Sequence, residues 1–301
     1  MTRGGLRAAW DAFRYARLLP RTAQSRRSGR AYAHLVGTVE AALDPVRGRV
    51  AQRRLQRWLG VSSAAARRTF RRSLVSEAQE EADTVFFMAH ESDLRPAFRV
   101  VGRPPVIEGP TIYVSLHFGS PLLLYLHLAL ARVPDCRVIA RPLDVRNPMC
   151  AAKRAYATRK VAWAERVSGH PFLLAERASM FDARAQLRRG GSLYMLVDVP
   201  GDVVDRSATF PLFGERVVLA NGLATLARIA TPHIQPLLTI PRAGGFDVHY
   251  GSLVSHASDA SVVADALAAL VPMVAAAPQE WWFWPYVPPR LDAEASPGGG
   301  T

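Results

Sequence analysis

The segment from Thr111 to Leu122 most constrains the fold, because it joins a strand to a helix through a very short turn. The run Thr-Ile-Tyr-Val-Ser-Leu is apolar and rich in β-branched and aromatic residues, and it ends at His117. Phe-Gly-Ser-Pro follows, and a second apolar run then begins at Leu122. This order is typical of α/β folds, which bind ligands at the carboxyl ends of parallel strands. His117 therefore stands where a functional histidine is expected.

The same alternation of strand and helix patterns continues along the chain. Apolar β-rich runs predict strands at 98–102, 111–117, 137–141, 193–198, 233–240 and 247–250. Helical patterns lie at 122–132, 148–159, 176–189, 221–230, where Asn221 is a suitable N-cap, and 258–276. We therefore predict an α/β fold, with a mostly parallel central sheet flanked by helices and a basic helical N-terminal segment.

The composition excludes several classes of protein. The chain has 301 residues, of which 49% are hydrophobic, enough for a large buried core. Its two cysteines, Cys136 and Cys150, are too few for a disulfide framework or a cysteine metal site. There is no CxxC, HExxH, P-loop or GxGxxG motif, so we expect neither a metal nor a bound cofactor. Arginines interrupt every early apolar run, which argues against a signal peptide, and no apolar run is long enough to predict a spanning helix.

Positive charge is concentrated at the N-terminus. Residues 1–76 contain 17 arginines, no lysine and three acids, a net charge of +14, whereas the whole chain carries +13. The remainder is therefore close to neutral. We divide the chain into a basic amphipathic helical segment at 1–84, an α/β domain at 85–290 and a disordered tail at 291–301, which ends in Ser-Pro-Gly-Gly-Gly-Thr.

The basic segment has helical spacing, and its partner is open to three interpretations. One apolar face is predicted near the start of the chain, formed by Leu6, Trp10, Phe13, Ala16 and Leu18. Farther on, arginines between 53 and 72 alternate with Leu55, Trp58, Leu59 and Phe70. We favour helices that lie on an anionic membrane surface. The alternatives are helices that pack on the main domain, and a surface for nucleic acid or an acidic partner protein; no nucleic-acid-binding motif is evident, and we expect no nucleic acid partner.

Polar residues at three strand ends form a candidate site. His117, Arg141 and Asp198 each follow a predicted strand, so neighbouring strands would bring them to one edge of the sheet. His117 can act as a general base, and Asp198 can orient its ring. The backbone N–H groups of Gly119 and Ser120 lie at a helix start, where they could bind a developing oxyanion.

Five blocks of this sequence carry a resemblance to a known family. They are His117-Phe-Gly-Ser-Pro-Leu, Val138-Ile-Ala-Arg141-Pro142, Leu193–Asp198 with Phe210-Pro-Leu-Phe213-Gly214, the run from Asn221 to Pro232, and Pro278-Gln-Glu-Trp281-Trp-Phe-Trp284. In order and spacing they resemble the bacterial lipid A biosynthesis acyltransferase family, of the lysophospholipid acyltransferase superfamily. The similarity runs from about residue 85 to about residue 290.

The resemblance implies an acyltransferase. An acyl group would pass from an acyl carrier protein or CoA thioester to a hydroxyl or amine of a lipid or specialised-metabolite acceptor, at the cytoplasmic face of the inner membrane. His117 would be the general base and Asp198 its acidic partner. The matching blocks make Gly119, Ser120, Arg141, Phe213, Gly214 and Asn221 candidate substrate-binding residues, with Arg141 binding a phosphate or carboxylate.

Leu122 departs from the family pattern. The family has an acid five residues after its histidine, which orients the imidazole, and leucine cannot do so. Orienting acids contribute on the order of ten-thousandfold in serine proteases. Three outcomes are open. Asp198, or less favourably Asp144 or Asp202, takes over the role of the acid; the chemistry needs less assistance from a base; or the chain only binds a lipid or carrier protein. We favour the first two outcomes over the third.

Overall fold

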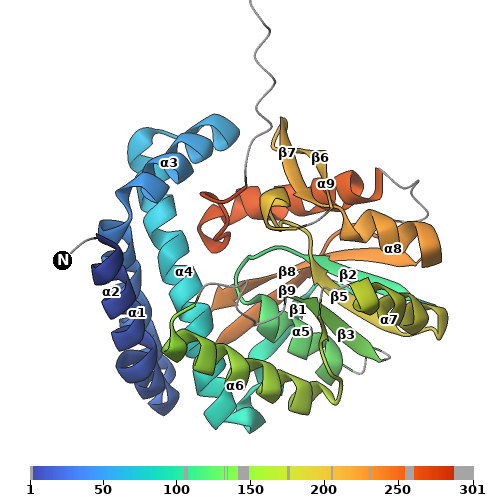
Figure 1. Ribbon diagram of the computed structural model, residues 1–301, viewed down its shortest axis with the longest axis horizontal. Helices are drawn as coiled ribbons and strands as arrows, with labels where there is room; N and C mark the ends of the chain where they lie inside the picture. Colours follow the sequence, from blue (N-terminus) through green and yellow to red (C-terminus); the bar gives the residue numbers. More distant parts are fainter. Residues whose placement is uncertain are drawn as a thin grey trace, which may run out of the picture.

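The predicted α/β class is confirmed by a computed structural model of the chain. The structure describes residues 3–104, 108–131, 133, 135–141, 149–174, 177–204, 206–230, 232–254 and 261–287. A seven-stranded, mostly parallel sheet is flanked by helices, and further helices from the N-terminal part of the chain stand beside it (Figure 1). The predicted tail at 291–301 lies outside the described residues.

The main sheet has the strand order β1-β9-β8-β2-β5-β3-β4. Its strands are β1 (Phe98–Val101), β2 (Thr111–Ser115), β3 (Cys136–Ala140), β4 (Leu173–Leu174), β5 (Ser192–Leu196), β8 (His233–Arg242) and β9 (Gly245–Tyr250). Strands β8, β2, β5, β3 and β4 are mutually parallel, whereas β9 is antiparallel to β8 and pairs in parallel with β1. Because β8 starts near α8 and ends near α4, the parallel strands end on the side facing α4 (Figure 1).

Three strands were not predicted from the sequence. Strands β6 (Ser207–Leu212) and β7 (Glu215–Ala220) form a separate antiparallel hairpin. Phe213 and Gly214 connect them, with φ values of 50° and 79°. The two-residue strand β4 was also missed, because so short a run carries no periodic pattern.

The helices of the α/β part cover both faces of the sheet. They are α5 (Pro121–Leu130), α6 (Ala151–Ser168), α7 (Arg177–Arg188), α8 (Gly222–Ala230) and α9 (Ser261–Ala276). Alternate residues of β2 enter two different cores: Ile112 packs in the cluster that includes residues of α7, α8 and α9, and Tyr113 in the cluster that includes residues of α5 and α6. The shortest helical turns are Glu91–Asp93, Arg95–Ala97, η5 (Gly201–Val203) and η6 (Pro278–Glu280).

The N-terminal helices enclose a buried polar network. They are α1 (Arg3–Phe13), η1 (Arg14–Leu18), η2 (Leu19–Gln24), α2 (Arg26–Leu43), α3 (Pro45–Leu59) and α4 (Ser63–Ala89). Arg14 is buried and forms ion pairs with Glu40 and Glu81, and Tyr32 donates a hydrogen bond to Glu81. The boundary predicted after residue 84 falls inside α4, which continues without interruption to Ala89.

The two predicted apolar faces of this segment differ in burial. Leu55 and Phe70 belong to the main core, so packing explains that face. The face near the start of the chain is divided: Trp10 and Leu18 pack against a buried cluster, whereas Leu6 is 46% and Phe13 50% exposed. Within the described part of the chain, no helix combines the length and the apolar character needed to cross a membrane.

Candidate functional site

The three predicted strand ends lie on neighbouring strands. Strand β5 lies between β2 and β3 in the sheet, and the register pairs Ser115 with Leu196. His117 and Asp198 each follow these paired residues by two positions, so the sheet itself places them side by side. Arg141 follows β3 directly and is exposed at the same edge.

His117 and Asp198 are in direct contact. The Nδ1 atom of His117 lies 2.8 Å from Oδ1 of Asp198. Because a carboxylate can only accept hydrogen bonds, this contact assigns the proton to Nδ1 and leaves a lone pair on Nε2. The His117 side chain is 25% exposed, whereas Asp198 is fully buried. This arrangement matches the orienting contact that a general-base histidine needs.

Three hydrogen bonds compensate for the burial of Asp198. Its Oδ2 atom accepts the backbone N–H of His117 and the indole Nε1–H of Trp281, each at 2.8 Å, while Oδ1 accepts the imidazole. A buried carboxylate is tolerated only when it is well hydrogen-bonded. Trp281 is therefore part of the site, a role that the sequence analysis missed although the tryptophan lies in one of the matching blocks.

The segment after α9 holds the histidine from a second side. Gly119 donates its N–H to the carbonyl of Glu280 at 2.8 Å, and Trp282 donates its N–H to the carbonyl of His117 at 2.9 Å. The ring of Phe283 stacks on the imidazole, with centroids 3.8 Å apart and an angle of 8° between the planes. The side chain of Glu280 is largely withdrawn from solvent, which raises its pKa, and it accepts a hydrogen bond from Ser76 of α4.

The structure corrects the predicted oxyanion site at Gly119 and Ser120. Both N–H groups already have acceptors, since Gly119 donates to Glu280 and Ser120 donates to Oγ1 of Thr239 at 3.1 Å. Gly119 has φ +57°, and a Cβ there would lie 2.1 Å from the carbonyl oxygen of Thr239. The turn is thus packed against β8, and its first two N–H groups serve the fold rather than a ligand.

Leu122 has an apolar environment. It is half-buried and packs against the core that includes other residues of α5. The carboxylate contact of His117 comes from the neighbouring strand instead, through Asp198. Of the other acids considered, Asp202 is exposed in η5 and Asp144 lies outside the described residues.

The remaining predicted residues lie farther from the histidine. Phe213 packs in an aromatic cluster with Trp58, Trp281 and Trp284, so it reaches Asp198 only through Trp281. Gly214 is exposed at the tip of the hairpin. Asn221 precedes α8, and its backbone bonds to Arg206 and Thr225.

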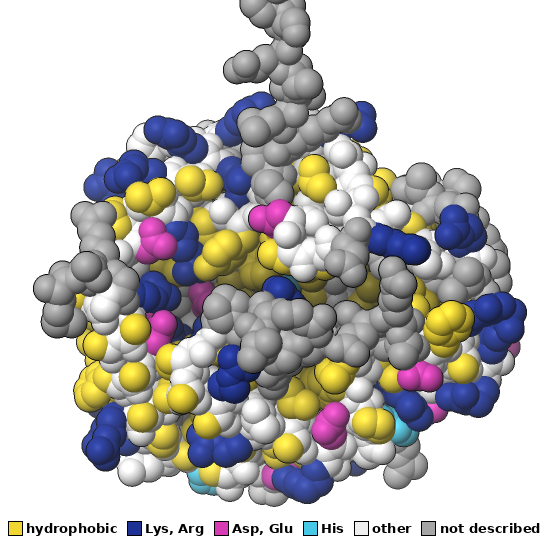
Figure 2. Space-filling model, in the orientation of Figure 1, with side chains coloured by type: hydrophobic (Ala, Val, Ile, Leu, Met, Phe, Trp, Pro, Cys, Tyr) yellow, Lys and Arg dark blue, Asp and Glu magenta, His cyan; other side chains and the backbone are white. Residues whose placement is uncertain are grey.

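Figure 2 shows a hollow with a hydrophobic floor near the middle of this face of the molecule. No group of three or more His, Cys, Asp or Glu side chains that could hold a metal ion occurs among the described residues.

Searches for related proteins add no name to this geometry: no protein-family model matches the chain, and no curated protein matches it significantly.

Proposed function

We propose that the chain is an acyltransferase that moves an acyl group from a thioester to a hydroxyl or amine. The observation that carries the proposal is the 2.8 Å contact between His117 and the buried Asp198 at adjoining strand ends. The resemblance of the surrounding blocks to lipid A biosynthesis acyltransferases supports the reaction class, and it makes an acyl carrier protein or CoA the donor.

The dyad accounts for the proton transfers of this reaction. Nε2 of His117 removes the proton of the acceptor hydroxyl or amine as its oxygen or nitrogen attacks the thioester carbonyl. Asp198 stabilises the imidazolium that results. When the tetrahedral intermediate collapses, the carbon–sulfur bond breaks, and the imidazolium returns the proton to the departing thiolate. Asp198 thereby supplies the carboxylate contact to His117 that leucine at position 122 cannot make.

We propose that the N-terminal helices bind an anionic membrane surface on the cytoplasmic face of the inner membrane. Leu6 and Phe13 on α1, Leu35 on α2 and Val46 on α3 are all exposed, in a segment that carries net charge +14. Exposed apolar side chains among arginines favour binding to anionic lipid, because burial and charge attraction act together.

A direct assay tests the reaction. The purified chain is incubated with acyl carrier and acyl-CoA thioesters and a lipid and metabolite extract, and acylated products are followed by mass spectrometry. His117→Ala should abolish transfer, whereas the matched control His34→Ala, at an exposed position of α2, should not. Undiminished product from His117→Ala would refute the assigned base.

A second variant tests the dyad. Asp198→Asn keeps the side-chain shape but allows the wrong tautomer of His117, so kcat should fall by about a thousandfold or more, as with the orienting acid of serine proteases. If no donor yields product with the unmodified chain, while that chain still binds acyl carrier protein or lipid, the rival assignment of a non-catalytic binding protein is supported.

A further inference from the structure

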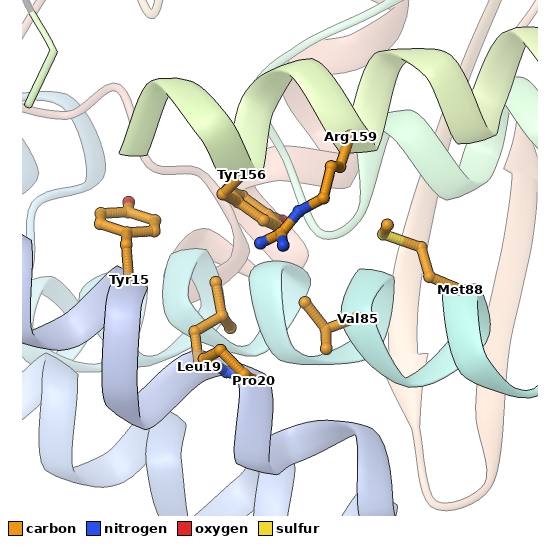
Figure 3. Close-up of a pocket in the computed structure, with 7 residues that line it drawn as sticks. All are labelled: Tyr15, Leu19, Pro20, Val85, Met88, Tyr156 and Arg159. Atoms are coloured by element: carbon orange, nitrogen blue, oxygen red, sulfur yellow. The ribbon is translucent and has the colours of Figure 1, made fainter. Parts of the chain in front are cut away.

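A cavity separate from the dyad lies where the N-terminal helices meet the α/β part of the chain. It has a volume of about 200 Å³. Figure 3 shows its lining side chains, which come from four elements: Tyr15 from η1, Leu19 from η2, Val85 and Met88 from α4, and Tyr156 and Arg159 from α6. None of these residues is among those that contact His117 or Asp198 within the described part of the chain.

The walls of this cavity suit an alkyl chain better than water. Leu19, Val85 and Met88 offer only apolar atoms, and the hydroxyl of Tyr15 is occupied by a hydrogen bond to Glu81. The buried hydroxyl of Tyr156 has no hydrogen-bond partner among the described residues, so it could offer a water one partner. A buried water needs about three hydrogen-bond partners. An apolar ligand that displaces poorly held water gains affinity, so the space favours a hydrocarbon group.

A cation stands at the edge of the apolar space. Arg159 is exposed, and its side chain extends from α6 into the space between α6 and α4 (Figure 3). Among the described residues, no carboxylate pairs with its guanidinium. An unpaired guanidinium beside an apolar cavity is complementary to an amphiphile with an anionic head, and the single positive charge matches a carboxylate.

From this arrangement we infer that the cavity binds a fatty carboxylate, with its alkyl chain between α4 and α6 and its carboxylate at Arg159. Such a ligand would contact η1, η2, α4 and α6 together. It would therefore stabilise the contact of the N-terminal helices with the α/β part. The inference is independent of the proposed acyl transfer, since it uses none of the residues of the dyad.

Methionine methyl NMR of the full chain tests the site without any activity assay. The chain has six methionines; Met88 lines the cavity, and Met195 lies on β5 three residues before Asp198. Titration with decanoate should shift the Met88 methyl signal saturably and leave that of Met195 in place. A shift of Met195 without a shift of Met88 would overturn the inference, because the carboxylate would then bind near the dyad.

Two variants and two further ligands separate the head contact from the chain contact. Arg159→Gln should weaken decanoate binding about fivefold, the scale of an exposed ion pair, and leave decanol binding unchanged. The matched control Arg27→Gln, at an exposed position of α2, should alter neither. Val85→Phe should fill the cavity and remove the Met88 shift with both ligands, with circular dichroism used to confirm that this variant is folded.

If Arg159→Gln and Arg27→Gln weakened decanoate binding equally, general charge attraction would explain the effect, and the proposed contact between the carboxylate and Arg159 would be overturned. Decyl phosphate that binds more tightly than decanoate would overturn the choice of a carboxylate. Decanoate binding that Val85→Phe leaves intact in a folded protein would place the ligand outside the cavity.

Discussion

Asp198 connects the residues of the site, because all three of its hydrogen-bond donors fix the position of His117 or of the segment after α9. Trp281 supplies the donor that comes from farthest along the chain. The indole is fully buried and packs edge-on against Trp284, with ring centroids 4.7 Å apart. In the proposed reaction it would act only through this carboxylate, as a positioning residue.

Trp281→Phe should lower kcat about tenfold and leave KM nearly unchanged. Phenylalanine keeps an aromatic ring in the cluster but cannot donate to Oδ2 of Asp198, so the carboxylate loses one of its three hydrogen bonds. Leaving a buried charged acceptor less satisfied costs on the order of 1–3 kcal/mol. Steady-state kinetics across pH check this, since an altered dyad changes the pH profile of kcat.

Trp284→Phe is the matched control for this substitution. Its indole donates to the carbonyl of Pro278 rather than to Asp198. It should lower stability by a similar amount and leave the pH profile of kcat unchanged. Identical profiles for Trp281→Phe and the unmodified chain would remove Trp281 from the positioning of the dyad.

A second buried carboxylate predicts how stability depends on pH. Asp83 of α4 is buried, and burial raises its pKa from 3.8 to about 6, although Arg26 and Gln79 partly offset the effect. The folded state therefore favours the protonated acid. The contribution of Asp83 to stability is fully present below pH 3.8 and is lost as the pH rises through about 6.

Asp83→Asn should therefore stabilise the chain at pH 8 by up to about 3 kcal/mol relative to the unmodified protein, since each pKa unit corresponds to about 1.4 kcal/mol. The difference between the two proteins should shrink towards pH 4. Urea unfolding at pH 4, 6 and 8 measures it. A difference that is constant over this range would show that Asp83 does not titrate as burial predicts.

At the level of single residues, the sequence indicated His117 and Asp198 because each ends an apolar strand run. It could not show that the N–H of Gly119 is used by Glu280, which lies far along the chain. The role of Trp281 was missed for the same reason, since its indole hydrogen bond exists only after the chain returns to the edge of β2. Contacts between distant segments leave no local pattern.

Among the elements, the close contact between α2 and α4 depends on a glycine, which has no side chain. Gly37 of α2 is buried, and a Cβ there would lie 2.6 Å from Cγ2 of Val75 and 2.9 Å from its backbone nitrogen. Gly37→Ala should lower the free energy of unfolding by about 1–3 kcal/mol through overpacking, despite the better helix propensity of alanine. Gly222→Ala, where the nearest atom is 3.7 Å away, is the control and should not destabilise the chain. Equal stability of both variants would show that α2 can move away from α4 without cost.

The elements of the α/β part were largely predictable, because strands buried in parallel sheets are continuous apolar runs. The hairpin of β6 and β7 was not, since Pro211 lies within β6 and the run resembles a loop. That the N-terminal helices pack on the main domain was one of three interpretations, but the way in which they pack on one another was beyond prediction. It depends on the pairing of Arg14 with Glu40 and Glu81, which brings one of many arginines into a buried position.

Across the whole molecule, positive charge and exposed apolar side chains occur together in the N-terminal helices. Other arginines of the same segment are engaged by the fold, as Arg54 is with the carbonyl of Trp284 and Arg57 is with Glu215. The sequence showed the asymmetry of charge but not which arginines remain exposed. A surface that combines both features should bind membranes in a way that depends on anionic lipid and on salt.

Vesicle co-sedimentation tests this at the scale of the intact chain. Binding should require anionic lipid and should weaken as salt rises, because ions screen the attraction between exposed arginines and the headgroups. Leu6→Ser with Phe13→Ser on α1 should weaken binding about tenfold at fixed salt, since two apolar side chains no longer enter the bilayer interface.

Phe181→Ser is the matched control: Phe181 is 72% exposed on α7, on the far side of the sheet from α1 (Figure 1), and its loss should have no effect on vesicle binding. Binding that ignores lipid charge and salt, or that Phe181→Ser weakens as much as the double variant does, would mean that the N-terminal helices do not form the membrane surface.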